Sequence, residues 1–296
     1  MNGFASTLNR LVFMKNNYSL KSSSPMAFDG KAEFYSEPNN INELMDVLES
    51  AYKMDIPVSC IGSGTNTLIS DRLIEGLVIS TKRLRGVTMK GALLECLPGE
   101  MLTEVIDKSI EHQLIGMEKL AGIPGTIAGA MNVNAEANGI SLSDFVYYFD
   151  FVTYNGTLKR VANYSDTFSS QTLNMPEDGI ITNIALRLNP SKATAEARIR
   201  KEMYVELLFI PPCSHFIGQV FKDTKDKKAA DIIKELRLDR IKGYAEYSSY
   251  QPNCIFSYPG CKANDVYELI KRAERDAKKE LGIRLERSIS LLGKFY

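Results

Sequence analysis

The sequence predicts an α+β protein with a mixed α/β domain first and a smaller α+β domain after it. An apolar stripe of helical spacing follows Pro38, and two short β-prone segments come next at Ile56 to Ile61 and Leu77 to Ser80. Two glycine-rich loops each follow a strand candidate. Strands and helices that alternate over short connections are typical of α/β domains. We therefore expect the first domain to hold a ligand at its strand ends.

The composition excludes several classes of protein. In a chain of 296 residues, 36 Lys plus Arg balance 36 Asp plus Glu, so there is no overall positive field to hold a nucleic acid. No window approaches the roughly 18 uncharged apolar residues that a membrane span needs. The apolar patch Leu11 to Met14 is too short for a secretory signal. We expect a cytoplasmic protein with neither nucleic acid nor membrane as a partner.

Cysteine and histidine usage predicts that no metal is bound. The five cysteines show no CxxC spacing, and His112 and His215 are the only histidines. A zinc site, a disulfide framework or a Ser-His-Asp triad could hardly be built from this set. Any redox or transfer chemistry would therefore come from an organic cofactor.

Local signals define most of the expected elements. Asn40 with Glu43 predicts the start of the first helix, and Asn155-Gly156 predicts a hairpin between Phe145 to Tyr154 and Leu158 to Val161. Other helices are expected at Thr103 to Gln113, at Ala195 to Leu208, and from Asn264 or Asp265 to Gly282. Other strands are expected at Leu93 to Leu97, Ile180 to Leu188 and Ile283 to Leu291.

A domain boundary is expected where the charged helical segment leads to Pro211-Pro212. We expect a first domain over residues 1–195, made of two lobes of about 1–85 and 86–195. A second domain would cover residues 196–296.

The first glycine-rich loop is Gly62-Ser63-Gly64-Thr65-Asn66-Thr67. Its glycines let backbone N–H groups converge on an anion, and its hydroxyl and amide side chains add further donors. It lacks the Lys-Ser/Thr of a P-loop and the spacing of a dinucleotide fingerprint. A plain tight turn is the alternative.

The second loop is Gly122-Ile123-Pro124-Gly125-Thr126, continued by Gly129 and Ala130. Small residues at these positions allow a flat ligand or a phosphate to approach the backbone. A helix start crowded against a sheet is the alternative. Two such loops some sixty residues apart, each after a strand, indicate one extended ligand of flavin-dinucleotide size.

Four separated segments agree with one known family in order and spacing. They are Ile61 to Asp71, Leu120 to Ala130 with Asn134-Ala135 and Gly139 after it, Gly218 to Asp223, and Asn264 to Ile270. They resemble the two flavin signatures, the GS-x-F-K-N motif and the last helix of the UDP-N-acetylenolpyruvoylglucosamine reductases of peptidoglycan synthesis. Ser19 to Ala32 is similar to that family's N-terminal segment. The short connection from Ile180 to Phe221 is similar to the family's shorter type.

The resemblance implies a fold, a cofactor and a ligand. The fold would be an FAD-binding α/β domain of the vanillyl-alcohol-oxidase type, followed by a smaller C-terminal α+β substrate domain. Gly62 to Thr67 and Gly122 to Ala130 would hold FAD. The C-terminal domain would close over a UDP-sugar, with Lys222 and Asp223 as substrate-binding positions. In such enzymes NADPH reduces the flavin, which then passes hydride to an enolpyruvyl group.

The positions that carry the family's proton and charge chemistry are substituted. The family's Ser is Gln219, its Arg falls at Tyr164 in the run Asn163 to Phe168, and its Glu is Ser288. Glu286, two residues away, is a possible substitute. Lys222 remains, whereas Asp223 replaces an Asn, and its carboxylate would repel an anionic ligand.

Three hypotheses follow. The chain is a flavoprotein whose reductase chemistry is altered, with Tyr164, Lys222 or Glu286 in new roles. Alternatively, it is a non-catalytic relative that binds FAD, a sugar nucleotide or a protein in a regulatory role. A third reading is an active NADPH-dependent reductase whose catalytic residues lie elsewhere.

Overall fold

The computed structural model describes residues 14–169, 171–207, 215–241 and 243–296. Pro211-Pro212, where a domain boundary is expected, and most of the apolar patch at residues 11–14 lie outside these ranges. Among the described helices, none combines the length and the apolar character that crossing a membrane requires.

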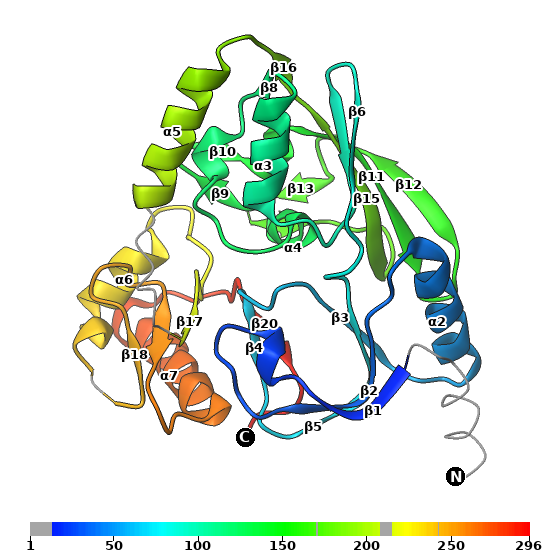
Figure 1. The fold of residues 1–296 in the computed structure, drawn as a ribbon. Helices are drawn as coiled ribbons and strands as arrows, with labels where there is room; N and C mark the ends of the chain where they lie inside the picture. The colour runs from blue at the N-terminus through cyan, green and yellow to red at the C-terminus, as the bar shows by residue number, and fades with distance from the viewer. Residues whose placement is uncertain (1–13, 170, 208–214, 242) are drawn as a thin grey trace. The chain divides into compact units, whose positions relative to one another are not determined.

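The described chain forms two compact units that interleave along the sequence (Figure 1). The first unit comprises residues 14–16, 34–63 and 76–207. The second unit comprises residues 17–33, 64–75 and 215–296. The chain passes between the units within strands β1 (Met14–Ser19), β2 (Lys31–Ser36) and β5 (Leu73–Ser80). The expected division at residue 195 stays a prediction.

One part of the first unit is built on a parallel strand pair and one helix. Strand β3 (Val58–Ile61) pairs in parallel with β5, in a sheet of order β1-β2-β5-β3. Helix α2 (Ile41–Lys53) buries Leu44, Val47, Leu48 and Ala51. Its start agrees with the predicted cap, because the Asn40 side chain accepts a hydrogen bond of 3.0 Å from the N–H of Glu43.

Another part of the first unit is an antiparallel sheet of order β12-β11-β15-β7-β6 with helices on one face (Figure 1). Its strands are β6 (Val87–Lys90), β7 (Leu93–Cys96), β11 (Val146–Thr153), β12 (Leu158–Ala162) and β15 (Gly179–Arg187). The helices are α3 (Leu102–Glu111), α4 (Ile127–Asn132) and α5 (Thr194–Leu207). The predicted hairpin of β11 and β12 is confirmed, and Gly156 in its turn has φ +87°, which glycine adopts readily.

Short elements complete the first unit. The strand pairs are β8 (Leu114–Ile115) with β16 (Asn189–Pro190), β9 (Glu136–Ala137) with β10 (Ile140–Ser141), and β13 (Phe168–Ser169) with β14 (Thr172–Leu173). The 3₁₀ turns are η2 (Glu118–Leu120) and η3 (Leu142–Asp144).

The second unit packs two helices and a small sheet around one core. Sheet β17-β19-β18 is antiparallel, and β20 pairs in parallel with β4. The core includes Phe221, Tyr247 and Ile270, each 0% exposed. The elements are η1 (Lys21–Ser23), β4 (Thr67–Ile69), β17 (His215–Ile217), α6 (Ala229–Glu235), η4 (Leu238–Arg240), β18 (Ala245–Tyr247), β19 (Ile255–Ser257), α7 (Ala263–Asp276), the π-helical turn η5 (Ala277–Leu281) and β20 (Ser290–Leu292).

Two details at the C-terminus differ from the sequence prediction. Helix α7 begins at Ala263, because the side chains of Asp265 and Asp71 accept hydrogen bonds from the N–H groups of Lys262 and Ala263. The strand predicted over Ile283 to Leu291 is confirmed only at β20. The residues before β20 bend to reach the segment around Phe221, which opposes Arg287 in an isolated antiparallel bridge.

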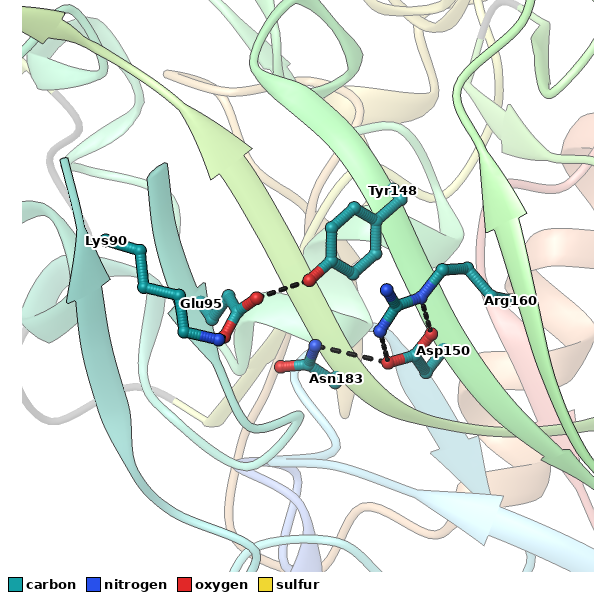
Figure 2. A network of polar contacts seen from close by, with 6 residues as sticks. All are labelled: Lys90, Glu95, Tyr148, Asp150, Arg160 and Asn183. Atoms are coloured by element: carbon teal, nitrogen blue, oxygen red, sulfur yellow. Dashed lines mark hydrogen bonds and ion pairs between the residues drawn. The ribbon is translucent and has the colours of Figure 1, made fainter. Parts of the chain in front are cut away.

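The outer face of the five-stranded sheet carries a polar network (Figure 2). The hydroxyl of Tyr148 donates to Glu95, and the ammonium of Lys90 lies 2.7 Å from the same carboxylate. Arg160 donates two hydrogen bonds of 2.6 and 2.8 Å to Asp150, and its guanidinium lies over the Tyr148 ring. The hydrogen bonds from Lys90 and Tyr148 hold the pKa of Glu95 below its usual value, and the bond to Glu95 raises the pKa of Tyr148.

We predict that Tyr148→Phe lowers the free energy of unfolding by about 1 kcal/mol at pH 7, because a charge-assisted hydrogen bond is lost. A carboxyl whose pKa is lowered by folding stabilises above its unfolded pKa of about 4.3 and loses that contribution as the pH falls. The effect of the substitution should therefore shrink in acid. Urea unfolding at pH 7 and at about pH 3.5 measures both effects.

Tyr147→Phe is the matched control. The Tyr147 ring lies 4.0 Å from the Arg187 guanidinium, a contact that the substitution keeps. Equal losses of stability in the two variants at pH 7 would contradict the role given to the Tyr148 hydroxyl.

Candidate functional site

The first glycine-rich loop begins at the carboxyl end of β3. Because β3 runs parallel to β5, the carboxyl ends of both strands lie at one edge of the sheet. The N–H of Thr81, just after β5, donates a hydrogen bond of 3.0 Å to the carbonyl of Ile61. Gly62 and Ser63 thus leave the sheet at the edge where α/β folds commonly bind ligands.

The second loop is fixed by hydrogen bonds at its centre. The N–H of Leu102 donates to the carbonyl of Gly125 (3.0 Å), and the N–H of Ile127 donates to the carbonyl of Glu100 (2.8 Å). Between them, Thr126 caps helix α4 by accepting a hydrogen bond from the N–H of Gly129 (3.3 Å). The loop is therefore also a helix start, as the alternative interpretation of its glycines expected.

The two loops meet at Gly62. A Cβ placed on Gly62 would lie 2.5 Å from the Oγ1 of Thr126, closer than real side chains pack. The structure therefore brings the two loops together in the first unit, although Gly62 and Thr126 are 64 positions apart in the sequence.

The residues present fit an anionic cofactor. Among the described residues, the backbone N–H groups of Gly62 and Ser63 have no hydrogen-bond acceptor. Neighbouring N–H groups that no protein atom uses are suited to bind phosphate oxygens. The rest of the second loop varies in exposure: Gly122 and Ile123 are half-buried, Pro124 and Gly129 are exposed, and Ala130 packs in the core at 6% exposure.

The first loop continues into the second unit, where Gly64 is tightly packed. Gly64 has φ +70°, and a Cβ there would overlap the carbonyl oxygen of Ser23. The Ser24 hydroxyl donates a hydrogen bond of 3.1 Å to the Gly64 carbonyl. The N-terminal segment that resembles the known family thus lies against this loop. Thr65 and Thr67 follow and are half-buried.

Asn66 links the loop to Ser288. Its Nδ2 donates a hydrogen bond of 2.9 Å to the carbonyl of Ser288, and its carbonyl accepts one of 3.0 Å from the N–H of Ser290. The Asn66 Oδ1 is buried and has no hydrogen-bond partner among the described residues. This acceptor is available to a donor group of a ligand.

The segment around Phe221 lies beside residues 286–288. The N–H of Lys222 donates to the carbonyl of Glu286 (2.8 Å), and the N–H of Ser288 donates to the carbonyl of Val220 (2.9 Å). The structure therefore brings three predicted positions, Lys222, Glu286 and Ser288, into one place in the second unit.

Asn253 holds the same segment from the other side. Its side chain accepts a hydrogen bond from the N–H of Phe221 (2.9 Å) and donates one to the Phe221 carbonyl (2.7 Å). Its own carbonyl accepts a bond of 2.7 Å from the N–H of Val220. Asn253 is 8% exposed, and the sequence analysis missed it because no local pattern marks it.

The remaining predicted positions lie as follows. Gln219 is exposed and has φ +35°, a left-handed conformation that is uncommon for a residue other than glycine. Glu286 is exposed and Ser288 is half-buried. Asp223 accepts a hydrogen bond of 2.8 Å from the N–H of Ala229 and so supports the start of α6. Tyr164 belongs to the first unit and is 70% exposed.

No group of three or more His, Cys, Asp or Glu side chains within the described ranges is arranged to hold a metal ion.

Comparisons with protein families match two regions of the chain. Residues 32–162 match the FAD binding domain, which confirms FAD as the cofactor. Residues 212–292 match the C-terminal domain of UDP-N-acetylenolpyruvoylglucosamine reductase.

Two proteins with similar sequences are UDP-N-acetylenolpyruvoylglucosamine reductases. The UDP-N-acetylenolpyruvoylglucosamine reductase of Prochlorococcus marinus is 32% identical over 287 residues, which cover 95% of this chain and 99% of that protein. The reductase of a Synechococcus species is 31% identical over 90% of this chain and 87% of its own.

Solved structures share the fold. The MurB reductase of Thermus caldophilus aligns with a TM-score of 0.79 at 23% identity, over 95% of this chain and all of that one. A chitooligosaccharide oxidase aligns over 63% of this chain and 43% of its own, with a TM-score of 0.51 at 13% identity. These likenesses and the two domain matches confirm the vanillyl-alcohol-oxidase-type domain followed by a C-terminal α+β domain. The chain belongs to the UDP-N-acetylenolpyruvoylglucosamine reductase family.

Proposed function

We propose that this chain is an FAD-binding member of the family whose reductase chemistry at a nucleotide-sugar site is altered or lost. The observation that carries the proposal is the set of residues beside Lys222. Gln219 and Ser288 stand where the family has its Ser and its Glu, and both lie within three residues of the hydrogen bonds that join the two segments.

The cofactor part rests on the backbone of the first unit. Gly62 and Ser63 would bind the pyrophosphate through their N–H groups, and Gly125, Thr126 and Gly129 would approach the ring system. When bound, FAD supplies the hydride carrier, with NADPH as the reductant. The full proposed set is Gly62, Ser63, Gly64, Thr65, Asn66, Thr67, Gly122, Ile123, Pro124, Gly125, Thr126, Gly129 and Ala130.

The ligand part rests on the second unit. The Lys222 ammonium would attract the diphosphate or carboxylate of a nucleotide-sugar-like ligand. Asp223, one residue on, is exposed and would weaken that attraction. Its hydrogen bond to the start of α6 gives this carboxylate a structural role as well.

The family's reductase reaction needs a proton donor and charge-stabilising groups, which Gln219, Tyr164 and Ser288 supply poorly. Protonation of the substrate after hydride arrives needs a general acid, and the Gln219 carboxamide cannot serve as one. A positioned acid or base contributes roughly 10²–10⁴-fold, and a charge-stabilising donor roughly 10²–10³-fold. The losses are not additive, but three substitutions leave little beyond ligand binding and the reactivity of the flavin.

An active NADPH-dependent UDP-N-acetylenolpyruvoylglucosamine reductase is the second candidate. The identity of 32% to a protein of that name over 95% of the chain favours it. Glu286 would then replace the family's Glu, since its backbone pairs with Lys222 and its side chain is exposed.

The visible absorption spectrum tests these readings. The purified protein is recorded with FAD, then with NADPH in the absence of oxygen, and then with UDP-N-acetylenolpyruvoylglucosamine. We expect flavin bands that NADPH bleaches and that the substrate does not restore. Rapid restoration would instead establish the active reductase. Bands that neither NADPH nor NADH bleaches would indicate a non-catalytic, regulatory binding protein.

A restored active site should gain turnover. We predict that Gln219→Ser, Tyr164→Arg and Ser288→Glu together raise substrate-dependent NADPH oxidation by at least roughly 10²-fold, because a proton donor and charged groups return. The control replaces Ser288→Glu by Ser249→Glu, which adds a carboxylate at an exposed serine elsewhere in the second unit. A triple variant that binds FAD but stays at the wild-type rate would count against these positions.

Gly62→Ala should weaken FAD binding by about tenfold or more, because its new methyl group forces the two loops apart. Titration of flavin fluorescence measures the dissociation constant. Gly243→Ala is the control, since the nearest heavy atom to its Cβ would be 3.6 Å away. Wild-type affinity in Gly62→Ala would contradict the placement of the cofactor against this loop.

A further inference from the structure

Glu100 is a buried carboxylate held between two cations. Its side chain is 3% exposed. One carboxylate oxygen accepts a hydrogen bond of 3.1 Å from the ammonium of Lys108 on α3. The other accepts one of 3.2 Å from the guanidinium of Arg85, which also forms an ion pair with Glu104. Lys108 and Arg85 are both partly exposed, so only the carboxylate is fully removed from water.

The backbone at Glu100 carries the second glycine-rich loop. The Glu100 carbonyl accepts the hydrogen bond from Ile127 (2.8 Å), and Met101 opposes Thr126 in an antiparallel bridge. The Leu102 N–H donates to the Gly125 carbonyl (3.0 Å). Residues 100–102 are therefore the strand-like support on which residues 125–127 rest.

Residues 100–102 are linked to the first glycine-rich loop through the contact between Thr126 and Gly62. Thr126 is the residue whose Oγ1 leaves no room for a Cβ at Gly62. Any shift of Glu100 would be passed through Ile127 and Thr126 to the place where the two loops meet. The ion pairs join Glu100 to α3 and to the segment after β5, which both belong to the first unit.

Burial of a carboxylate at this place is not explained by packing. A buried ion pair stabilises a fold little better than apolar residues of similar size, because the charges lose their water. Removal of the charge alone leaves Arg85 and Lys108 without their shared partner. A loss of stability is therefore expected when the charge is removed, and a separate readout of the flavin site is needed to recognise a role in positioning.

We propose that Glu100 is a positioning residue for FAD: its two ion pairs set the backbone on which the flavin-binding loops meet. The inference rests on the proposed placement of FAD at Gly62 and at Gly125 to Gly129. The carboxylate of this residue bonds to Arg85 and Lys108, which belong to neither loop.

The test compares Glu100→Gln with Glu118→Gln. Glu118 is also buried (5% exposed). Its carboxylate accepts hydrogen bonds of 3.0 Å from Arg200 and from the N–H of Gly116. Neither of these two partners belongs to a glycine-rich loop. Three quantities are measured for each protein: the melting temperature without FAD, the FAD dissociation constant, and the visible circular dichroism of the bound flavin.

We expect Glu100→Gln to weaken FAD binding at least tenfold and to change the visible circular dichroism of the flavin. Glu118→Gln should lower the melting temperature to a similar extent but keep both flavin properties. If Glu100→Gln does not fold, Lys108→Gln removes one ion pair from the partly exposed side, and the same changes are expected on a smaller scale.

The outcomes separate this inference from the proposed function. A wild-type chain that binds no FAD overturns both. Wild-type affinity and circular dichroism in Glu100→Gln overturn the inference alone, and so do equal flavin changes in the Glu118→Gln control. If Lys108→Gln has to be used, an unchanged visible circular dichroism spectrum of the bound flavin also overturns the inference alone.

Discussion

The close approach of Gly62 to Thr126 is the constraint on which the proposed cofactor site depends. One loop can lie on the other only because position 62 has no side chain. Thr126 caps α4, and both of its neighbours are fixed, because the N–H of Ile127 donates to the Glu100 carbonyl and the N–H of Leu102 donates to the Gly125 carbonyl. The N–H groups of Gly62 and Ser63, which follow the end of β3, have no hydrogen-bond acceptor among the described residues. Such a site is built from backbone, so its chemistry tolerates change in most surrounding side chains.

The second unit depends on a different kind of interaction. Its segment from Val220 to Lys222 is held on one side by Asn253 and on the other by residues 286–288, and Asn66 ties the glycine-rich loop to Ser288. These bonds use backbone groups and two asparagine side chains. The side chains at Gln219 and Ser288 can therefore be exchanged without loss of the frame that presents them.

Much of the fold could be predicted from local signals. The Asn40 cap, the apolar stripe of α2 and the turn at Asn155-Gly156 each depend on residues within a few positions of one another. The prediction was wrong for most of residues 283–291, where a bridge between Arg287 and Phe221 replaces a continuous strand. That bridge joins residues 66 positions apart, which no local pattern can reveal. The parallel pairing of β4 with β20, in which Thr67 lies opposite Ser290, was hidden for the same reason.

The candidate site could be predicted only in part, and there is a physical reason why some of its residues could be recognised in the sequence and others could not. Glycine-rich loops leave a sequence signal because the backbone needs small residues in consecutive places, so both loops were found. Glu100 and Asn253 leave none, because their roles arise from burial against distant partners. The same distinction bears on the substitutions proposed at Gln219 and Ser288. The proposed cofactor site is built from backbone groups, and the segment from Val220 to Lys222 is held by Asn253 and by the backbone of residues 286–288. Neither arrangement uses the side chain at position 219 or 288, so the cofactor site and this frame can persist whatever proton donor those two positions supply.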